Sequence, residues 1–427
     1  MVRGASSANG SSVAVVLAGG GAFGAYEAGV LEYVLGTLSK DPAFRHAGPR
    51  FDIACGTSVG ALNASHVGAS AREPARGAEQ LGAFWRSLTF NEVLRFGLQE
   101  LSAAVALMLG TRPGQPATAK GLSPRPRALA HQPVAGLFDT SPLRRAITRI
   151  VPWASLTDNI AQGLMRGVAV CATEICTGLS VIFYETAQST TYRPGRDPTK
   201  LTKWVRLGPE HAMASAAIPF VFPAVQINGV CYTDGALRQN TPLNPALRMG
   251  ADRVLVVSVS QDPAVASCKA RVGCRRNPYP GGLFLLGKTV GILLSQSLDY
   301  ELGRIEMYNK LLTSGAQIYG PGFAAELNAM VGDHRNATYR PVKTCHIRPT
   351  ENPHELALEA LEHAPHEIDL PGAPGKVLGR LMRSAMFAES ELLGTMMFTP
   401  TFVRALADLG YRDAQAKRAE LVEFFAP

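Results

Sequence analysis

Residues 13–24 read VAVVLAGGGAFG, and residues 51–60 read FDIACGTSVG. Each stretch is a short apolar run that leads into a glycine-rich turn. A helical pattern follows each turn, over residues 25–38 in the first case and from residue 59 in the second. A continuous apolar run is typical of a parallel strand that is buried on both faces of a sheet. Two strand–turn–helix units in succession therefore predict a parallel α/β sheet with right-handed crossovers.

The first 260 residues continue this alternation. The expected strands share a run of apolar residues, and they lie at 13–18, 51–55, 167–171, 179–183, 230–233 and 253–259, with a strand-like start near 203. A helix is expected over residues 211–219 (HAMASAAIP), with Pro219 as its end. Together these elements predict a three-layer α/β/α sandwich around a mainly parallel sheet.

Shifts in composition indicate how the chain is organised. The sheet-forming part contains a stretch with five prolines among basic residues, which predicts a loop insertion. The expected segments are a flexible N-terminus (1–12), the α/β domain (13–260) with its insertion (about 111–133), a linker (261–280), and a helical C-terminal extension (281–427) with loops near 320–350 and 364–375.

The overall composition excludes several classes of protein. Of the 427 residues, 46% are hydrophobic and 18% are charged, against roughly 25% charged in an average soluble domain. This apolar content is enough to offset the entropy of ordering the chain, so a disordered protein is excluded. Scattered glycine and proline exclude a collagen-like or coiled-coil rod. The formal net charge of +8 leaves nucleic acid and membrane surfaces to be weighed as partners.

Targeting and redox features are sparse. The apolar run at 13–18 is too short for the core of a signal peptide, and no run reaches the ~20 residues of a membrane-spanning helix. We therefore expect a cytoplasmic protein without a signal peptide or transmembrane helix; the alternative is a protein secreted without a cleaved signal. The seven cysteines show no CxxC spacing, which argues against a zinc site. Whether Cys268 and Cys274, which flank a polar loop, form a bridge in an oxidising compartment stays open.

The sequence GTSVG at residues 56–60 is a G-x-S-x-G motif between a predicted strand and a predicted helix. A serine on such a sharp turn stands clear of the sheet, above the N-terminus of the next helix. The flanking glycines allow backbone to pass where a Cβ would clash. The pattern predicts Ser58 as a nucleophile, with an elbow formed by Gly56, Thr57, Val59 and Gly60; the alternative is a purely structural turn.

The first glycine turn consists of Gly19, Gly20, Gly21, Ala22, Phe23 and Gly24, and it also fits G-x-G-x-x-G. A dinucleotide site would need an acidic residue at the end of the next strand, but Asp52 lies at its start. Glycine N–H groups at a helix start can instead face the oxygen that becomes negative during acyl transfer. With a nucleophilic elbow on the neighbouring strand, an oxyanion hole is the favoured interpretation.

A nucleophilic serine needs a base, and a Ser-His-Asp triad is the ordinary arrangement. None of the nine histidines follows a strand in a glycine-rich setting, and the best placed, His211, is interpreted as a solvent-facing cap of a helix. Asp234 comes directly after a short strand, before Gly235 and Ala236. A desolvated carboxylate with a raised pKa can take the serine proton itself. By itself, however, an aspartate before a glycine is more often a turn residue.

These motifs carry a resemblance to the patatin-like phospholipase family. The matching blocks occur in the family's order and span about three fifths of the chain: GGGAFGAYEAGVLEYV (19–34), GTSVGALNA (56–64), ASAAIPFVFPAVQINGVCYTDGALRQNTPL (214–243) and GADRVLVVSVS (250–260). The resemblance implies a lipid acyl hydrolase with a Ser-Asp dyad, in which Ser58 is the nucleophile and Asp234 of the DGA motif is the base. It also implies that residues 19–24 form the oxyanion hole, and that an acyl-serine intermediate forms.

One position departs from the family pattern. The family commonly has Arg or Lys where this chain has Phe23. Backbone donors survive that change, but a positive charge near a phosphate head group is lost. A preference for phospholipid over other esters is therefore less secure. Phe23 would contact either an acyl chain or the protein core.

The positive charge is concentrated in one stretch. Residues 112–149 carry seven basic residues and one acidic residue, and a second basic cluster lies at 269–276. Anionic lipid attracts such segments by about 1 kcal/mol per basic residue. We hypothesise that residues 94–109 and the basic loop after them meet a membrane surface. Unchanged binding to anionic vesicles after deletion of residues 112–133 would refute this, and the alternative is a solvated insertion. Nucleic acid is an unexpected partner, because aromatic residues and reader motifs are missing from the basic stretches.

The sequence thus predicts a serine hydrolase of lipid acyl esters that needs no metal and no cofactor. Two alternatives are an α/β-hydrolase esterase with a histidine base and a catalytically silent lipid-binding scaffold. The head group and position of the acyl chain in the substrate are not predicted, and neither is the oligomeric state.

Overall fold

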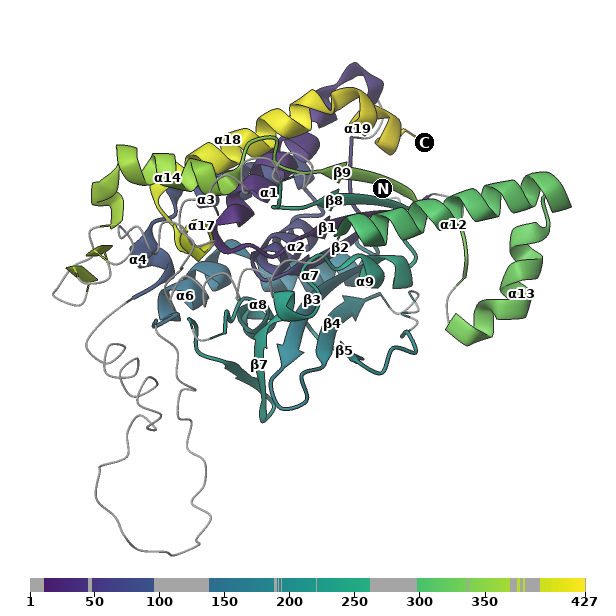
Figure 1. Cartoon of the computed structure of the whole chain (residues 1–427), viewed down its shortest axis with the longest axis horizontal. Coiled ribbons are helices and arrows are strands. Elements are labelled where there is room, and N and C mark those ends of the chain that lie inside the picture. Colours follow the sequence, from purple (N-terminus) through teal and green to yellow (C-terminus); the bar gives the residue numbers. More distant parts are fainter. Residues whose placement is uncertain are drawn as a thin grey trace, which may run out of the picture.

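The computed structural model describes residues 11–44, 48–95, 138–187, 190, 192, 194–219, 221–261, 298–335, 338–368, 375–376, 379–380 and 392–426. At its centre is a nine-stranded, mostly parallel sheet (Figure 1). Seven strands follow the order β5-β4-β3-β2-β1-β8-β9, and β6 and β7 form a hairpin beside β3. The strands are β1 (Val13–Leu17), β2 (Ile53–Thr57), β3 (Gly167–Glu174), β4 (Ser180–Thr186), β5 (Lys200–Trp204), β6 (Val225–Ile227), β7 (Val230–Asp234), β8 (Arg253–Val257) and β9 (Lys343–Ile347).

The parallel pairing decides where loops gather. Strand β1 pairs in parallel with β2 and β8, β2 pairs in parallel with β3, and β8 pairs in parallel with β9. Strands β4 and β7 are antiparallel to β3. The carboxyl ends of β1, β2 and β8 therefore lie at one edge of the sheet, where ligand sites of α/β folds form.

Alternate strand residues face two separate hydrophobic cores. Val15 and Leu17 of β1 belong to the larger core, and Ala14 and Val16 belong to the smaller one. Helices α9 (Leu243–Arg248) and α12 (Leu298–Tyr319) contribute to the smaller core. The helices of the larger core are α1 (Gly24–Leu31), α2 (Val59–Ala69), α3 (Pro74–Ser87), α4 (Phe90–Val93), α6 (Ser141–Ile150), α7 (Trp153–Ala161), α8 (Pro209–Ser215), α14 (Pro353–His363), α17 (Leu392–Met396), α18 (Pro400–Ala416) and α19 (Arg418–Phe425). The predicted three-layer sandwich is confirmed.

The C-terminal region is helical, as expected, but it also supplies strand β9. We expected a loop near 320–350, and that expectation is wrong for residues 323–335, which are helical, and for Lys343–Ile347, which pairs with β8. Helix α13 (Phe323–Arg335) precedes this strand. Helix α18 packs closely along α1, where a Cβ on Gly29 would collide with the carbonyl of Ala407. In Figure 1 the purple N-terminal helix and the yellow C-terminal helix lie together on one side of the sheet.

Two predicted helices differ in their bounds. The helix expected over 25–38 is α-helical only as far as Leu31 and continues as a π-helix over Glu32–Thr37. Helix α8 ends at Ser215, four residues before Pro219. A proline disfavours the helical conformation of the residue before it, here Ile218. A helix that ends ahead of Ile218 is therefore consistent with the sequence.

Several expectations fall outside the described residues. They concern residues 1–10 of the N-terminal segment expected at 1–12, the insertion expected at about 111–133, most of the apolar run before it, the basic cluster at 269–276 and the pair Cys268 and Cys274. In the part of the chain that is described, no helix has the length and apolarity to cross a bilayer.

Candidate active site

Ser58 lies between the carboxyl end of β2 and the first residue of α2, and its backbone has φ 55° and ψ −124°. A positive φ is costly for a residue with a side chain and is typical of a nucleophile elbow. The two glycines of the motif make the turn feasible. A Cβ on Gly60 would lie 2.5 Å from the carbonyl oxygen of Leu17, and one on Gly56 would collide with the carbonyl of Gly60.

Strand β3 brings the two parts of the candidate dyad together. Its Cys171 pairs with Thr57, next to Ser58, and its Ala172 pairs with Asp234 at the end of β7. As a result, the Ser58 hydroxyl donates a hydrogen bond of 2.8 Å to Oδ2 of Asp234. Both side chains are buried. The two residues are 176 positions apart in the sequence, so only the fold places them in contact.

Burial controls the electrostatics of Asp234. It raises the pKa of this carboxyl from 3.8 to about 7, against the opposing effect of two hydrogen bonds, from the Ala236 N–H and the Ser58 hydroxyl. The Ala236 N–H donates to Oδ1 at 2.8 Å, so the two carboxylate oxygens have different partners. Position 235 must be glycine, because a Cβ there would collide with the carbonyl of Cys171. The DGA residues thus fix the carboxylate and leave it poised to exchange a proton near neutral pH.

The glycine loop lies directly beside the serine. A Cβ on Gly19 would be 3.1 Å from the Ser58 Cβ. Residues Gly21–Phe23 form a single 3₁₀ turn that leads into α1, and Gly21 has φ 58°. The N–H of Gly19 donates to Asn240 Oδ1 at 2.9 Å, which ties the loop to the turn after the DGA motif.

Internal hydrogen bonds occupy part of this loop. The N–H of Phe23 donates to the Gly20 carbonyl, and the N–H of Gly24 points back to the carbonyls of Gly21 and Ala22. With the N–H of Gly19 bound to Asn240, the amides of Gly20, Gly21 and Ala22 are left without a hydrogen-bond acceptor among the described residues.

Phe23 contacts the C-terminal helix. Its half-buried ring meets the ring of Phe402 edge-on, with centroids 6.1 Å apart. A Cβ on Gly394 would also lie 2.7 Å from the Phe23 Cζ. Phe23 does not line the cavity beside Ser58. These contacts favour core packing over contact with an acyl chain.

Several supporting residues were not predicted. Ser215 accepts the Ser58 N–H at 2.8 Å and donates to the Cys171 carbonyl, which holds the elbow against β3. Asn240, in the turn after the DGA motif, accepts the Gly19 N–H with its side chain. Thr395 from the C-terminal region presses its carbonyl against Gly21. The sequence offers no signal for Thr395, because its neighbours in space are more than 370 residues away.

Among the described residues, the histidines lie apart from the candidate dyad. Ser58 and Asp234 bond to each other, and no described histidine bonds to either of them. His211 was expected to face solvent, and that expectation is wrong, because the side chain is buried. Its Nδ1 accepts the Gly208 N–H at 3.0 Å, and its ring packs on Phe183. The capping role is therefore present, but the histidine caps the helix from the protein interior, beside Phe183.

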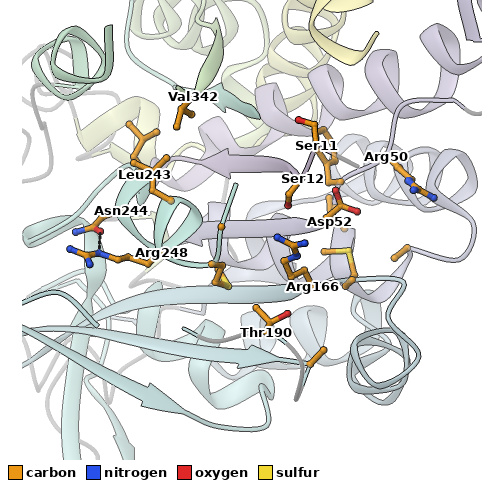
Figure 2. A pocket seen from close by; sticks show the side chains of 18 of the residues that line it. Ser11, Ser12, Arg50, Asp52, Arg166, Thr190, Leu243, Asn244, Arg248 and Val342 are labelled. Carbon is orange, nitrogen blue, oxygen red and sulfur yellow. Dashed lines mark hydrogen bonds between the residues drawn. The ribbon is translucent and has the colours of Figure 1, made fainter. Parts of the chain in front are cut away.

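Two cavities differ sharply in their relation to Ser58. A small apolar cavity of about 20 Å³ adjoins it, and the walls are Gly21, Ser58, Val59, Leu62, Phe84, Trp85, Leu88, Leu143, Ile147, Ala216, Ile218, Phe222 and Phe398. A cavity of about 1020 Å³ lies instead where the parallel strands begin (Figure 2). Ser12, Asp52 and Arg166, which directly precede β1, β2 and β3, line it. It contains neither Ser58 nor Asp234, whereas Ser58 lines the small cavity.

No group of three or more histidine, cysteine, aspartate or glutamate side chains in the described ranges is arranged to hold a metal ion.

A family model described as patatin-like phospholipase matches residues 15–247, more than half of the 427-residue chain. The chain belongs to the patatin-like phospholipase family. The matched range begins in β1 and ends in α9, so it contains the glycine loop, the serine elbow and the DGA motif. Membership in this family indicates a lipid hydrolase.

Two solved structures are similar to this patatin-like chain. VipD from Legionella pneumophila matches with 11% identity and a TM-score of 0.36, over 97% of this chain and 67% of VipD. Human GIVD cytosolic phospholipase A2, in complex with methyl gamma-linolenyl fluorophosphonate, matches with 12% identity and a TM-score of 0.36, over 97% of this chain. This chain spans 58% of that human chain. A comparison with curated protein sequences found no match to this patatin-like chain.

Proposed function

We propose that this patatin-like protein hydrolyses acyl ester bonds of lipids by way of an acyl-serine intermediate, with Ser58 as nucleophile and Asp234 as base. The observation that carries the proposal is the buried 2.8 Å hydrogen bond from the Ser58 hydroxyl to Asp234 Oδ2. A serine hydroxyl is a weak nucleophile unless a neighbouring base takes its proton. Asp234, with its pKa raised to about 7, is such a base at neutral pH.

The reaction proceeds in two halves. Ser58 Oγ attacks the carbonyl carbon of the ester while its proton passes to Asp234. The tetrahedral intermediate then collapses, the ester C–O bond breaks, and Asp234 returns the proton to the leaving alcohol oxygen. A water molecule attacks the acyl-serine in the same way, with Asp234 again accepting a proton. The fatty acid leaves and Ser58 regains its hydrogen.

The glycine loop stabilises the negative oxygen in both intermediates. The N–H groups of Gly20, Gly21 and Ala22 are the candidates, because the other amides of the loop are used internally. Loss of one such donor costs other hydrolases about 10²–10³ in kcat. Backbone donors of this kind do not depend on the side chain at position 23.

The substrate class is a lipid ester with an apolar acyl chain. Apart from Ser58, every wall of the small cavity is apolar. Phe23 stands where the family commonly has a basic residue, so we do not assign a phosphate-bearing head group. The activity is that of a carboxylic ester hydrolase of the phospholipase A type, with the head group left unspecified.

Activity on a medium-chain nitrophenyl ester tests this proposal. We expect Ser58→Ala and Asp234→Asn each to lower kcat at least about 10³-fold, because each removes one half of a unit that acts together. Ser65→Ala is the matched control, because Ser65 is a buried serine of α2 whose hydroxyl has the Ala61 carbonyl as its sole hydrogen-bond partner among the described residues. A wild type no faster than Ser58→Ala would leave a silent lipid-binding scaffold.

A further inference from the structure

One buried amide joins three helices around the candidate active site. Asn63 is on α2, five residues after Ser58, and its Nδ2 donates to the Gly24 carbonyl at 3.1 Å and to Glu27 Oε2 at 2.8 Å. Its Oδ1 accepts the indole N–H of Trp85 at 2.9 Å. The side chains of Glu27, Asn63 and Trp85 are all buried.

The two ends of this chain of hydrogen bonds are parts of the site. Gly24 is the last residue of the glycine loop and the first of α1, and Trp85 of α3 lines the small cavity beside Ser58. The two also touch, because a Cβ on Gly24 would lie 2.5 Å from Cζ2 of the Trp85 ring. The orientation of the indole therefore affects both the loop and the cavity.

The partners of Asn63 permit a single orientation of its amide. Its NH₂ group faces two acceptors, and its oxygen faces the one indole donor. A flipped amide would turn its oxygen toward the Gly24 carbonyl and its donors toward the indole N–H. Burial raises the pKa of Glu27 well above its usual range, which favours the neutral form of this carboxyl, and its Oε2 accepts from Asn63.

The indole is consequently held more firmly than the other walls. The cavity of about 20 Å³ holds roughly one water molecule. An acyl chain must therefore displace part of the wall. The remaining large wall residues, such as Leu143, Phe222 and Phe398, have no polar anchor in their side chains. Trp85 has one, in Asn63.

We propose that Trp85 sets the length of acyl chain that this enzyme accepts, and that Asn63 is the positioning residue that locks Trp85 in place. The inference rests on the proposed function, because it concerns the acyl group transferred to Ser58. Truncating the indole opens space beside the serine. Removing the Asn63 amide frees the indole to turn away from Gly24.

The test uses the full chain and a series of nitrophenyl esters from butyrate to decanoate. In Trp85→Leu we expect the ratio of kcat/KM for decanoate to that for butyrate to rise about tenfold or more, since each methylene accommodated is worth a factor of about ten. Trp85→Phe and Asn63→Ala should raise the same ratio by smaller factors. The double variant Asn63→Ala/Trp85→Leu should not exceed Trp85→Leu, because both changes release the same wall.

The matched control is Trp153→Phe. Trp153 also packs against the larger core, its indole N–H has no partner among the described residues, and it does not line the cavity. Its chain-length ratio should equal that of the wild type. Trp85→Phe and Asn63→Ala serve as independent tests if Trp85→Leu fails to give a near-ultraviolet circular dichroism spectrum of a folded protein.

The outcomes separate this inference from the proposed function. A ratio within twofold of the wild type in the folded Trp85 variants, with Ser58→Ala still inactive, overturns the inference and leaves the function standing. A changed ratio in the Trp85 variants but not in Asn63→Ala overturns the positioning role of Asn63. If the wild type is no more active than Ser58→Ala on any ester of the series, both proposals are overturned.

Discussion

At the scale of single residues, Asp234 makes a prediction about pH. Its carboxyl has a pKa raised to about 7 by burial, and the ionised form is the base. The ionised fraction grows as the pH rises, so kcat/KM should increase through about pH 7 and level off above it. Initial rates on a nitrophenyl ester between pH 5 and 9 measure this. A rate that fell over the same range would contradict the assignment.

The sequence predicts the two residues of the candidate dyad, but not the residues that support them. Ser58 and Asp234 stand in motifs whose glycines are required by close backbone contacts, and these glycines are visible in the sequence. Asn63 and Ser215 are ordinary polar residues within helices. Their structural roles come from hydrogen bonds to other elements, such as those with the Trp85 indole and the Cys171 carbonyl. A local sequence pattern does not predict such distant partners.

At the scale of elements, the glycine loop predicts unequal costs for two glycine substitutions. Gly21 has φ 58°, and a Cβ there would collide with the Thr395 carbonyl. Gly21→Ala should therefore lower activity more than tenfold and destabilise the protein by about 1–3 kcal/mol. Ester hydrolysis and urea unfolding monitor the two effects.

Gly36→Ala is the control for that experiment. Gly36 lies in the π-helical segment after α1, and no atom lies within 4 Å of the position of an added Cβ. Alanine should stabilise this helical position by about 0.5–1 kcal/mol and leave activity unchanged. Equal losses from Gly21→Ala and Gly36→Ala would show that the loop conformation has no special role.

The pattern of each strand explains which elements were predictable. Strands β1 and β2 are buried along almost their whole length, so they appear as continuous apolar runs. Strand β9 (KTCHI) lies at the end of the sheet order and is buried only at Cys345 and Ile347. With two buried residues among polar ones, this segment lacks the continuous apolar run that indicated strands β1 and β2 in the sequence. Pairing with β8 makes this segment a strand.

At the scale of the whole molecule, the C-terminal region packs against the first helix of the sheet-forming part. Tyr26 of α1 donates to Asp413 of α18 at 3.0 Å, and a Cβ on Gly410 of α18 would collide with the Tyr26 carbonyl. The side chains of Tyr26 and Val30 are fully buried. A chain ending at residue 260 would lose both α18 and β9, which would leave this face of α1 bare and β8 at the edge of the sheet.

We therefore expect the chain ending at residue 260 to lack cooperative unfolding and ester hydrolysis, although it contains every residue of the dyad and the glycine loop. Thermal unfolding followed by circular dichroism, with a parallel rate measurement, checks this. Cooperative unfolding together with wild-type activity would show that the sheet-forming part is an independent domain. The sequence suggested a division near residues 261–280, but it could not reveal contacts between α1 and α18.

The central claim is that Ser58 is a nucleophile activated by Asp234, and covalent trapping tests it most directly. The full chain is treated with a fluorophosphonate, digested, and examined by mass spectrometry. We expect a single phosphonylated serine at Ser58, with labelling at least about tenfold slower in Asp234→Asn because the base is missing. An unlabelled Ser58 in a protein that still hydrolyses esters, or equal labelling with and without the Asp234 carboxylate, would contradict the claim.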